Sequence, residues 1–244
     1  MLLAALAAFV GAAVQSATGF GFALVLSPAL FAVLDPVEAV TTLILLGLAL
    51  GVLVLFEDGR PEHVEWRALV PALLAALPGL GLGALALTRL SKEALQLIVG
   101  VAVMLAAVWQ LRERRRRSRP HLGTGAGVAA GFVSGVLTTS ISVSGPPFVL
   151  WLEARGTAPE RFRASLAASF VVLNVCGGAV LLAAEGSGSF DAGVVGPLLV
   201  LVVAGYAVGA AAFRRLDRER FFVLVLLLVA ATGLASVAAG LDLL

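Results

Sequence analysis

The polar residues that could do chemistry in this 244-residue chain gather in two short stretches, each inside a long apolar segment. The first stretch, Gln15 to Gly21 (QSATGFG), lies within Leu2 to Leu34, and the second, Thr138 to Pro147 (TTSISVSGPP), lies within Gly123 to Leu152. No charged side chain occurs in either segment. Backbone that breaks a helix at membrane depth is tolerated only where protein packs around it or where it lines a cavity. A matched pair of such breaks therefore predicts a binding site.

The chemistry that these two breaks offer is the binding of an anion. A cation at membrane depth normally requires an acidic residue, and the nearest ones, Asp35, Glu38 and Glu153, lie at the edges of apolar segments. We expect a helix to begin after each break, and the free N–H groups at a helix N-terminus carry roughly half a positive charge. Amide and hydroxyl side chains nearby could donate hydrogen bonds to the oxygens of one small oxyanion.

The predicted binding residues share a position in or beside the breaks. They are Gln15, Ser16, Thr18, Gly19, Gly21, Thr138, Thr139, Ser140, Ser142, Ser144, Gly145 and Pro146, with Asn174 from the following apolar segment. An alternative stays open for each hydroxyl, which could instead bond to a neighbouring backbone carbonyl and only relieve the broken helix. For Asn174 the alternative is a hydrogen bond between two helices.

The composition indicates an integral membrane protein. Sixty per cent of the residues are hydrophobic and 13 per cent are charged, with a mean hydropathy of +1.05, which is far more apolar than a soluble core of this size requires. The single cysteine, Cys176, lies in an apolar segment, so we expect no disulfide, no metal site and no cofactor. The run RERRRRSR lies between two apolar segments, which favours a cytoplasmic anchor over a nucleic-acid site.

The distribution of arginine predicts the topology. Suppose that each broken segment is a hairpin of two half-helices that enters and leaves the membrane on one side. Four loops then share one face of the membrane and hold 15 of the 17 Lys and Arg residues: 57–67, 112–119, 153–163 and 214–220. The positive-inside rule then places that face in the cytoplasm and both termini outside it. Uninterrupted segments of spanning length complete the all-α fold: Val37–Phe56, Ala68–Leu87, Ala94–Leu111, Ala164–Ala184, Ala192–Phe213 and Phe221–Leu241.

The two halves of the chain repeat each other. A shift of 126 residues superposes Gly79 on Gly205 and Gly83 on Gly209, and a shift of 120 superposes Thr18 on Thr138. Each half is a hairpin followed by three spans, and because three is odd the second half must be inverted. We therefore expect a first half at 1–111, a basic connecting loop at 112–121 and a second half at 122–244. Inverted halves suit alternating access, because they can exchange conformations.

At these residues the sequence resembles the TauE/SafE family of sulfite exporters, also called the TSUP family. The segments that carry the resemblance are GAAVQSATGFGFALVLSPAL with Asp35-Pro36, and GFVSGVLTTSISVSGPPFVLWL. It covers essentially the whole chain and implies a prokaryotic inner-membrane permease that moves sulfite, sulfonates or related small sulfur-containing anions, often outward. The matching motif residues are Gln15, Thr18, Gly19 and Gly21, and Ser144, Gly145, Pro146 and Pro147. Many relatives have a glycine-rich run where this chain has Thr139 to Val143, so the identity of the anion stays open.

Other classes of function explain the sequence less well. An intramembrane hydrolase would need a base beside its nucleophile, but the two histidines, His63 and His121, lie in or beside loops. A passive anion channel shares every feature of the permease and stays open. A purely structural membrane protein would leave two polar breaks at membrane depth without a purpose. Since no apolar segment carries a buried carboxylate, we expect transport to be driven by the anion gradient and the membrane potential.

Overall fold

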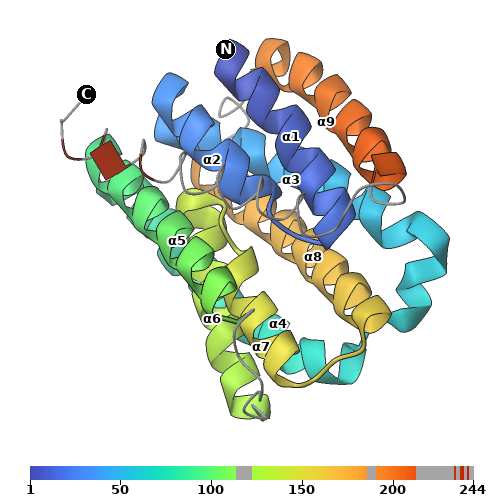
Figure 1. Ribbon diagram of the computed structural model, residues 1–244. Coiled ribbons are helices and arrows are strands. Elements are labelled where there is room, and N and C mark those ends of the chain that lie inside the picture. The colour runs from blue at the N-terminus through green and yellow to red at the C-terminus, as the bar shows by residue number, and fades with distance from the viewer. Residues whose placement is uncertain (114–122, 186–190, 213–233, 235–236, 239–240, 242–244) are drawn as a thin grey trace.

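The computed structural model describes residues 1–113, 123–185 and 191–212, with 234, 237–238 and 241 near the C-terminus. These residues form helices and no strands, which confirms the all-α prediction. Most of the predicted span Phe221–Leu241, most of loop 112–119 and all of loop 214–220 lie outside the described residues. The elements, shown in Figure 1, are α1 (Leu2–Thr18), α2 (Phe22–Val33), α3 (Pro36–Phe56), the 3-10 helix η1 (Glu57–His63), α4 (Trp66–Arg89), α5 (Lys92–Glu113), α6 (Thr124–Ile141), α7 (Gly145–Ala154), α8 (Pro159–Glu185) and α9 (Ala192–Ala212).

Several of these helices are built to cross a membrane. Among the described residues α3, α4, α6, α8 and α9 are long and apolar enough to span it. Their outer faces carry large apolar side chains such as Leu74 on α4 and Val200 on α9, which are 61% and 69% exposed. A soluble monomer rarely exposes so much contiguous apolar surface. The chain is therefore a multi-pass membrane protein, as its composition predicts.

Each broken segment forms two helices that run in opposite directions, so both are hairpins. The arms are unequal, because α1 has 17 residues and α2 has 12, while α6 has 18 and α7 has 10. At about 1.5 Å per residue, α6 is about 27 Å long, which is close to the thickness of the hydrocarbon core. The prediction of two half-helices thus describes α2 and α7, whereas α1 and α6 are longer than half a span.

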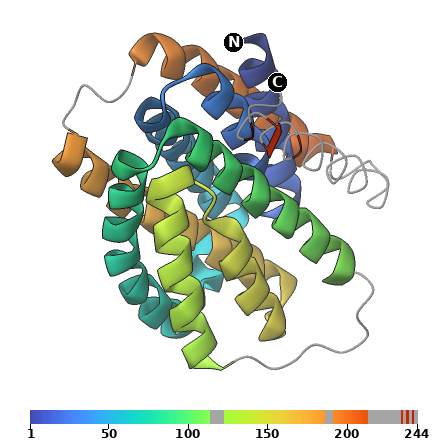
Figure 2. The ribbon, with the colours of Figure 1, turned by 90° about the vertical axis from the view of Figure 1, so that its left-hand side faces the viewer.

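The two hairpins enter from opposite ends of the molecule. Figures 1 and 2 show the α1–α2 hairpin descending from the end where the N-terminus lies, and the α6–α7 hairpin rising from the other end. Loops 57–67 and 153–163 lie together at that other end, where Arg161 Nη1 is 3.8 Å from Glu65 Oε1. The backbone N–H of Glu65 also donates to Ser165 Oγ at 3.1 Å. If α6 and α7 enter and leave on the same side, loops 57–67 and 153–163 must lie on one face of the molecule. Their contacts agree with such a hairpin.

Glycines allow very close helix packing at two matching places. A Cβ atom built on Gly79 or Gly83 of α4 would collide with the carbonyl oxygens of Phe132 and Val136 on α6. Such small residues let two backbones approach each other closely. Gly79 and Gly83 therefore form a packing surface for α6.

The corresponding contact joins α9 to α1. A Cβ atom on Gly205 or Gly209 would collide with the carbonyl oxygens of Phe9 and Ala13. Gly205 and Gly209 are the positions that the shift of 126 residues superposes on Gly79 and Gly83. Helix α4 thus packs on the long arm of the second hairpin, and α9 packs on the long arm of the first.

Candidate anion-binding site

A small cavity of about 40 Å³ lies where the two breaks meet. A water molecule needs roughly 10–15 Å³ on the same measure, so the cavity has room for a few waters or one small oxyanion. Its lining comes from both breaks and from α3 and α8, and contains no charged residue. The lining residues are Gln15, Phe20, Gly21, Phe22, Ala23, Leu24, Leu43, Gly47, Ser142, Val143, Ser144, Gly145, Phe170 and Asn174.

The first break is shaped by two glycines with left-handed backbone. Gly19 has φ 92° and donates its N–H to the carbonyl oxygen of Gln15 at 2.8 Å, which closes α1. Gly21 has φ 113° and is the N-cap of α2. Residues with a side chain rarely adopt such φ values, which explains glycine at both positions. The first bond of α2 runs from Val25 N–H to the Gly21 carbonyl, so the N–H groups of residues 22–24 have no acceptor within the helix. All three of these residues line the cavity.

The second break reaches the same turn with a serine. Ser142 has φ 59° and caps α6, with its N–H on the carbonyl oxygen of Thr138 at 3.1 Å. Ser134 Oγ holds the next part of the break by donating to the Ser144 carbonyl oxygen at 2.9 Å. Helix α7 then begins at Gly145, with proline in its first turn. Proline fits there because its missing N–H would have no helical acceptor.

Four of the predicted binding side chains face this cavity with spare hydrogen-bonding capacity. Gln15, Ser142, Ser144 and Asn174 are only 5%, 6%, 8% and 9% exposed, and all four line the cavity. Their side chains make no hydrogen bond with any residue in the described part of the chain. Polar groups inside a protein are nearly always hydrogen-bonded, so these four side chains are available to a ligand or to water in the cavity. Gly21 and Gly145 also line the cavity, through backbone.

The other predicted residues lie outside the lining. The hydroxyls of Thr18, Thr138 and Ser140 each donate to the carbonyl four residues earlier, at 2.9, 2.6 and 2.7 Å. Thr139 donates across to the Leu80 carbonyl on α4 at 2.7 Å. These contacts are the backbone alternative that the sequence left open. Ser16, Gly19 and Pro146 complete the group outside the lining, and Ser16 Oγ is buried without a partner among the described residues.

Two residues that the sequence did not single out cap the helices that end at the breaks. Arg163 Nη2 donates to the Ser16 carbonyl oxygen near the end of α1 at 2.5 Å, and its side chain lies against Gly19. Ser27 Oγ donates to the Ile141 carbonyl oxygen, the last residue of α6, at 3.0 Å. The sequence did not mark either residue as functional, because Arg163 belongs to the predicted basic loop 153–163 and Ser27 is a lone hydroxyl in an apolar run.

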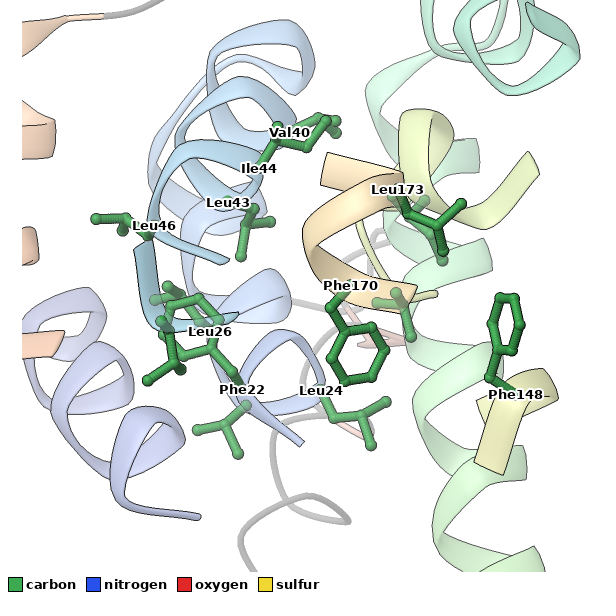
Figure 3. Close-up of a cluster of buried hydrophobic side chains, with 14 of the residues drawn as sticks. Phe22, Leu24, Leu26, Val40, Leu43, Ile44, Leu46, Phe148, Phe170 and Leu173 are labelled. Carbon is green, nitrogen blue, oxygen red and sulfur yellow. The ribbon is translucent and has the colours of Figure 1, made fainter. Parts of the chain in front are cut away.

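Aromatic side chains complete the cavity. A Cβ atom on Gly145 would lie 3.5 Å from the Phe170 ring and 3.9 Å from the Phe20 ring, so α8 and the first break both approach the start of α7. Figure 3 shows Phe170 of α8 above Leu24 of α2, with Phe148 of α7 to the right of both. These rings surround the polar groups with apolar surface, which strengthens electrostatic interactions inside.

The arrangement can bind an oxyanion but has no means of covalent chemistry in the described residues. The positive N-terminal ends of α2 and α7 open onto the cavity, whereas the negative C-terminal ends of α1 and α6 receive hydrogen bonds from Arg163 and Ser27. No base lies beside the serines of the lining, and no cluster of metal-ligating side chains occurs in the described residues.

Comparison with known proteins identifies the family of this sequence. The sequence profile described as "Sulfite exporter TauE/SafE" matches residues 3–236. A curated relative from Cupriavidus necator, named a probable sulfite/organosulfonate exporter TauE, is 30% identical over 166 residues. That alignment covers 65% of this chain and 62% of the relative, so this chain matches less than two thirds of the relative's length. No solved structure matches the chain.

Proposed function

This chain belongs to the TauE/SafE family of sulfite exporters, and from that premise we propose that it exports sulfite, sulfonates or related small sulfur-containing anions. The family is one of membrane exporters, which confirms the prediction of a transport protein and not an enzyme. The observation that carries the substrate class is the group of four buried side chains, Gln15, Ser142, Ser144 and Asn174, that face a cavity without protein partners. They offer amide and hydroxyl donors and no negative charge.

The two hairpins are proposed to hold the anion from opposite sides during alternating access. Support comes from the matched glycine contacts, in which α4 packs on α6 as α9 packs on α1. An exchange of conformations between residues 1–111 and 122–244 would open the cavity first to one side and then to the other. In this proposal the protein lies in the inner membrane of a prokaryotic cell, with both termini outside the cytoplasm and the basic loop 112–121 inside it.

Transport by the purified protein in liposomes tests this function. We expect sulfite or methanesulfonate on the far side to accelerate the entry of labelled anion, because a carrier returns faster when it is loaded. A passive channel would show no such counterflow. A lack of any anion-dependent flux, in protein that is folded by its thermal transition, would overturn the proposal.

The variants for this experiment compare residues that line the cavity with a buried residue outside the lining. Ser144→Ala and Gln15→Leu each remove donors that line the cavity, and each should raise the half-saturating anion concentration at least about tenfold, since hydrogen bonds to charged groups contribute about 1.5–3 kcal/mol. Ser169→Ala is the matched control, because Ser169 is also buried but its hydroxyl donates to the Ser165 carbonyl at 2.7 Å. It should leave the concentration dependence unchanged.

A further inference from the structure

We propose that the cavity selects singly charged oxyanions and rejects doubly charged ones of similar size, so that sulfite is carried as hydrogensulfite. This inference rests on the proposed function, because it assigns the charge of the anion that the same site binds. Its basis is the charge that surrounds the cavity, taken element by element.

The cavity has neutral donors only. Its polar side chains are two amides, from Gln15 and Asn174, and two hydroxyls, from Ser142 and Ser144. Helices α1, α2 and α6 contain no charged residue. Arg163 donates to the Ser16 carbonyl beside the first break and is not part of the lining. The other charged side chains of α3, α7 and α8 lie in the terminal turns of these helices, outside the lining: Glu38, Glu153, Glu160, Arg161 and Glu185. The Cys176 thiol, within α8, is also outside the lining.

The fixed positive charge at the cavity matches one negative charge. Each helix N-terminus is equivalent to roughly half an elementary charge, so α2 and α7 together supply about one. The similar negative charges at the C-terminal ends of α1 and α6 are offset by the Arg163 guanidinium, which donates to the Ser16 carbonyl. Their N-terminal residues, Phe22 and Gly145, both line the cavity. A second negative charge on the ligand would have no compensating partner there. It would also be harder to dehydrate, because the energy of ion solvation grows with the square of the charge.

A monoanion site links sulfite transport to protons without a titratable residue. Sulfite gains its first proton near neutral pH, so hydrogensulfite and the dianion coexist in the cell. Each transported hydrogensulfite carries one proton and one negative charge, and it releases the proton on the far side as it returns to equilibrium. Sulfite flux should therefore rise as the pH falls, although the lining holds no acid or base.

Three ligands of similar size test the inference on the purified full-length protein. Methanesulfonate carries one charge at every working pH and sulfate carries two. Methylphosphonate carries one charge in mildly acidic buffer and two in mildly alkaline buffer. Ligand-induced thermal shifts, titrated at constant ionic strength, give a dissociation constant for each.

We expect methanesulfonate to bind equally well at both pH values, which controls for titration of the protein. Methylphosphonate should bind at least about tenfold more weakly in alkaline buffer, and sulfate should be at least as weak at both pH values. Equal binding of the methylphosphonate monoanion and dianion, or binding of sulfate as tight as that of methanesulfonate, would overturn the inference and leave the anion site intact. Failure of all three ligands and of sulfite to bind would instead remove the anion site itself, and the inference with it.

Discussion

Replacement of Ser142 by glycine should make the protein more stable and a weaker binder of anions. Ser142 has φ 59°, in the left-handed region. A residue with a Cβ atom pays roughly 1–2 kcal/mol there, whereas glycine does not. The greater freedom of glycine in the unfolded chain offsets part of this gain, about 0.5–1 kcal/mol. Since the Ser142 hydroxyl has no partner among the described residues, its removal breaks no protein hydrogen bond. The net expectation is a stabilisation of about 0.5–1 kcal/mol, or about 2 °C in the melting temperature.

The same substitution removes one donor from the cavity. If the hydroxyl binds the anion, its loss should weaken binding by about 1.5–3 kcal/mol, or about 10- to 100-fold in the dissociation constant. The measurements are the melting temperature without ligand, and a methanesulfonate titration by calorimetry. Ser142→Ala is the matched control, because it loses the hydroxyl but keeps the Cβ atom and its strain. We expect the same loss of affinity from it without the gain in stability.

Two outcomes would refute this reasoning about Ser142. A less stable Ser142→Gly protein would mean that the side chain supports the fold and that the turn is not strained. Unchanged affinity in both variants would remove Ser142 from the binding site, even if the protein became more stable.

Three further predictions concern charge and packing around the breaks. Asn174→Asp keeps the size of the side chain but introduces a carboxylate at the cavity. Two like charges about 4 Å apart repel by about 4 kcal/mol at an effective dielectric constant of about 20, so a titration should detect no methanesulfonate binding, while Asn174→Ala should lose only about tenfold in affinity. Equal effects of the two substitutions would contradict the charge argument. Gly83→Ala should lower the melting temperature by several degrees, because its Cβ atom would collide with the α6 backbone, whereas Gly81→Ala, which meets nothing within 4 Å, should keep or raise it. Arg163→Gln should destabilise the protein by about 1–2 kcal/mol in thermal unfolding through the lost cap on the Ser16 carbonyl, and no change would show that this cap contributes nothing.

The sequence predicted the elements better than it predicted the individual contacts. The breaks at residues 19–21 and 142–144 were evident because glycine and proline interrupt long apolar runs, and these signals are local. The unequal arms were not evident, since nothing in an apolar sequence marks how deep a hairpin reaches. Arg163 was missed because its contact with Ser16 joins residues that are 147 positions apart in the chain.

The hydroxyls divide according to where the helix ends. Thr18, Thr138 and Ser140 lie within a helix, where a hydroxyl reaches the carbonyl four residues earlier. Ser142 and Ser144 follow the last helical residue, Ile141, and no such carbonyl is within reach. A sequence-based boundary is uncertain by several residues, so it could not separate these two classes.

The helix termini at the breaks give an independent reason to expect a ligand. A helix N-terminus leaves N–H groups without acceptors, and proteins usually satisfy them with a capping side chain or with water. Neither Gly21 of α2 nor Ser144 of α7 makes a side-chain cap. At the start of α1, α3 and α6 the capping residue is likewise without such a bond, but Met1, Asp35 and Gly123 are exposed. Among the helices that the structure describes, α2 and α7 alone begin beside the cavity, so a bound oxyanion would supply the acceptors that these two helices lack.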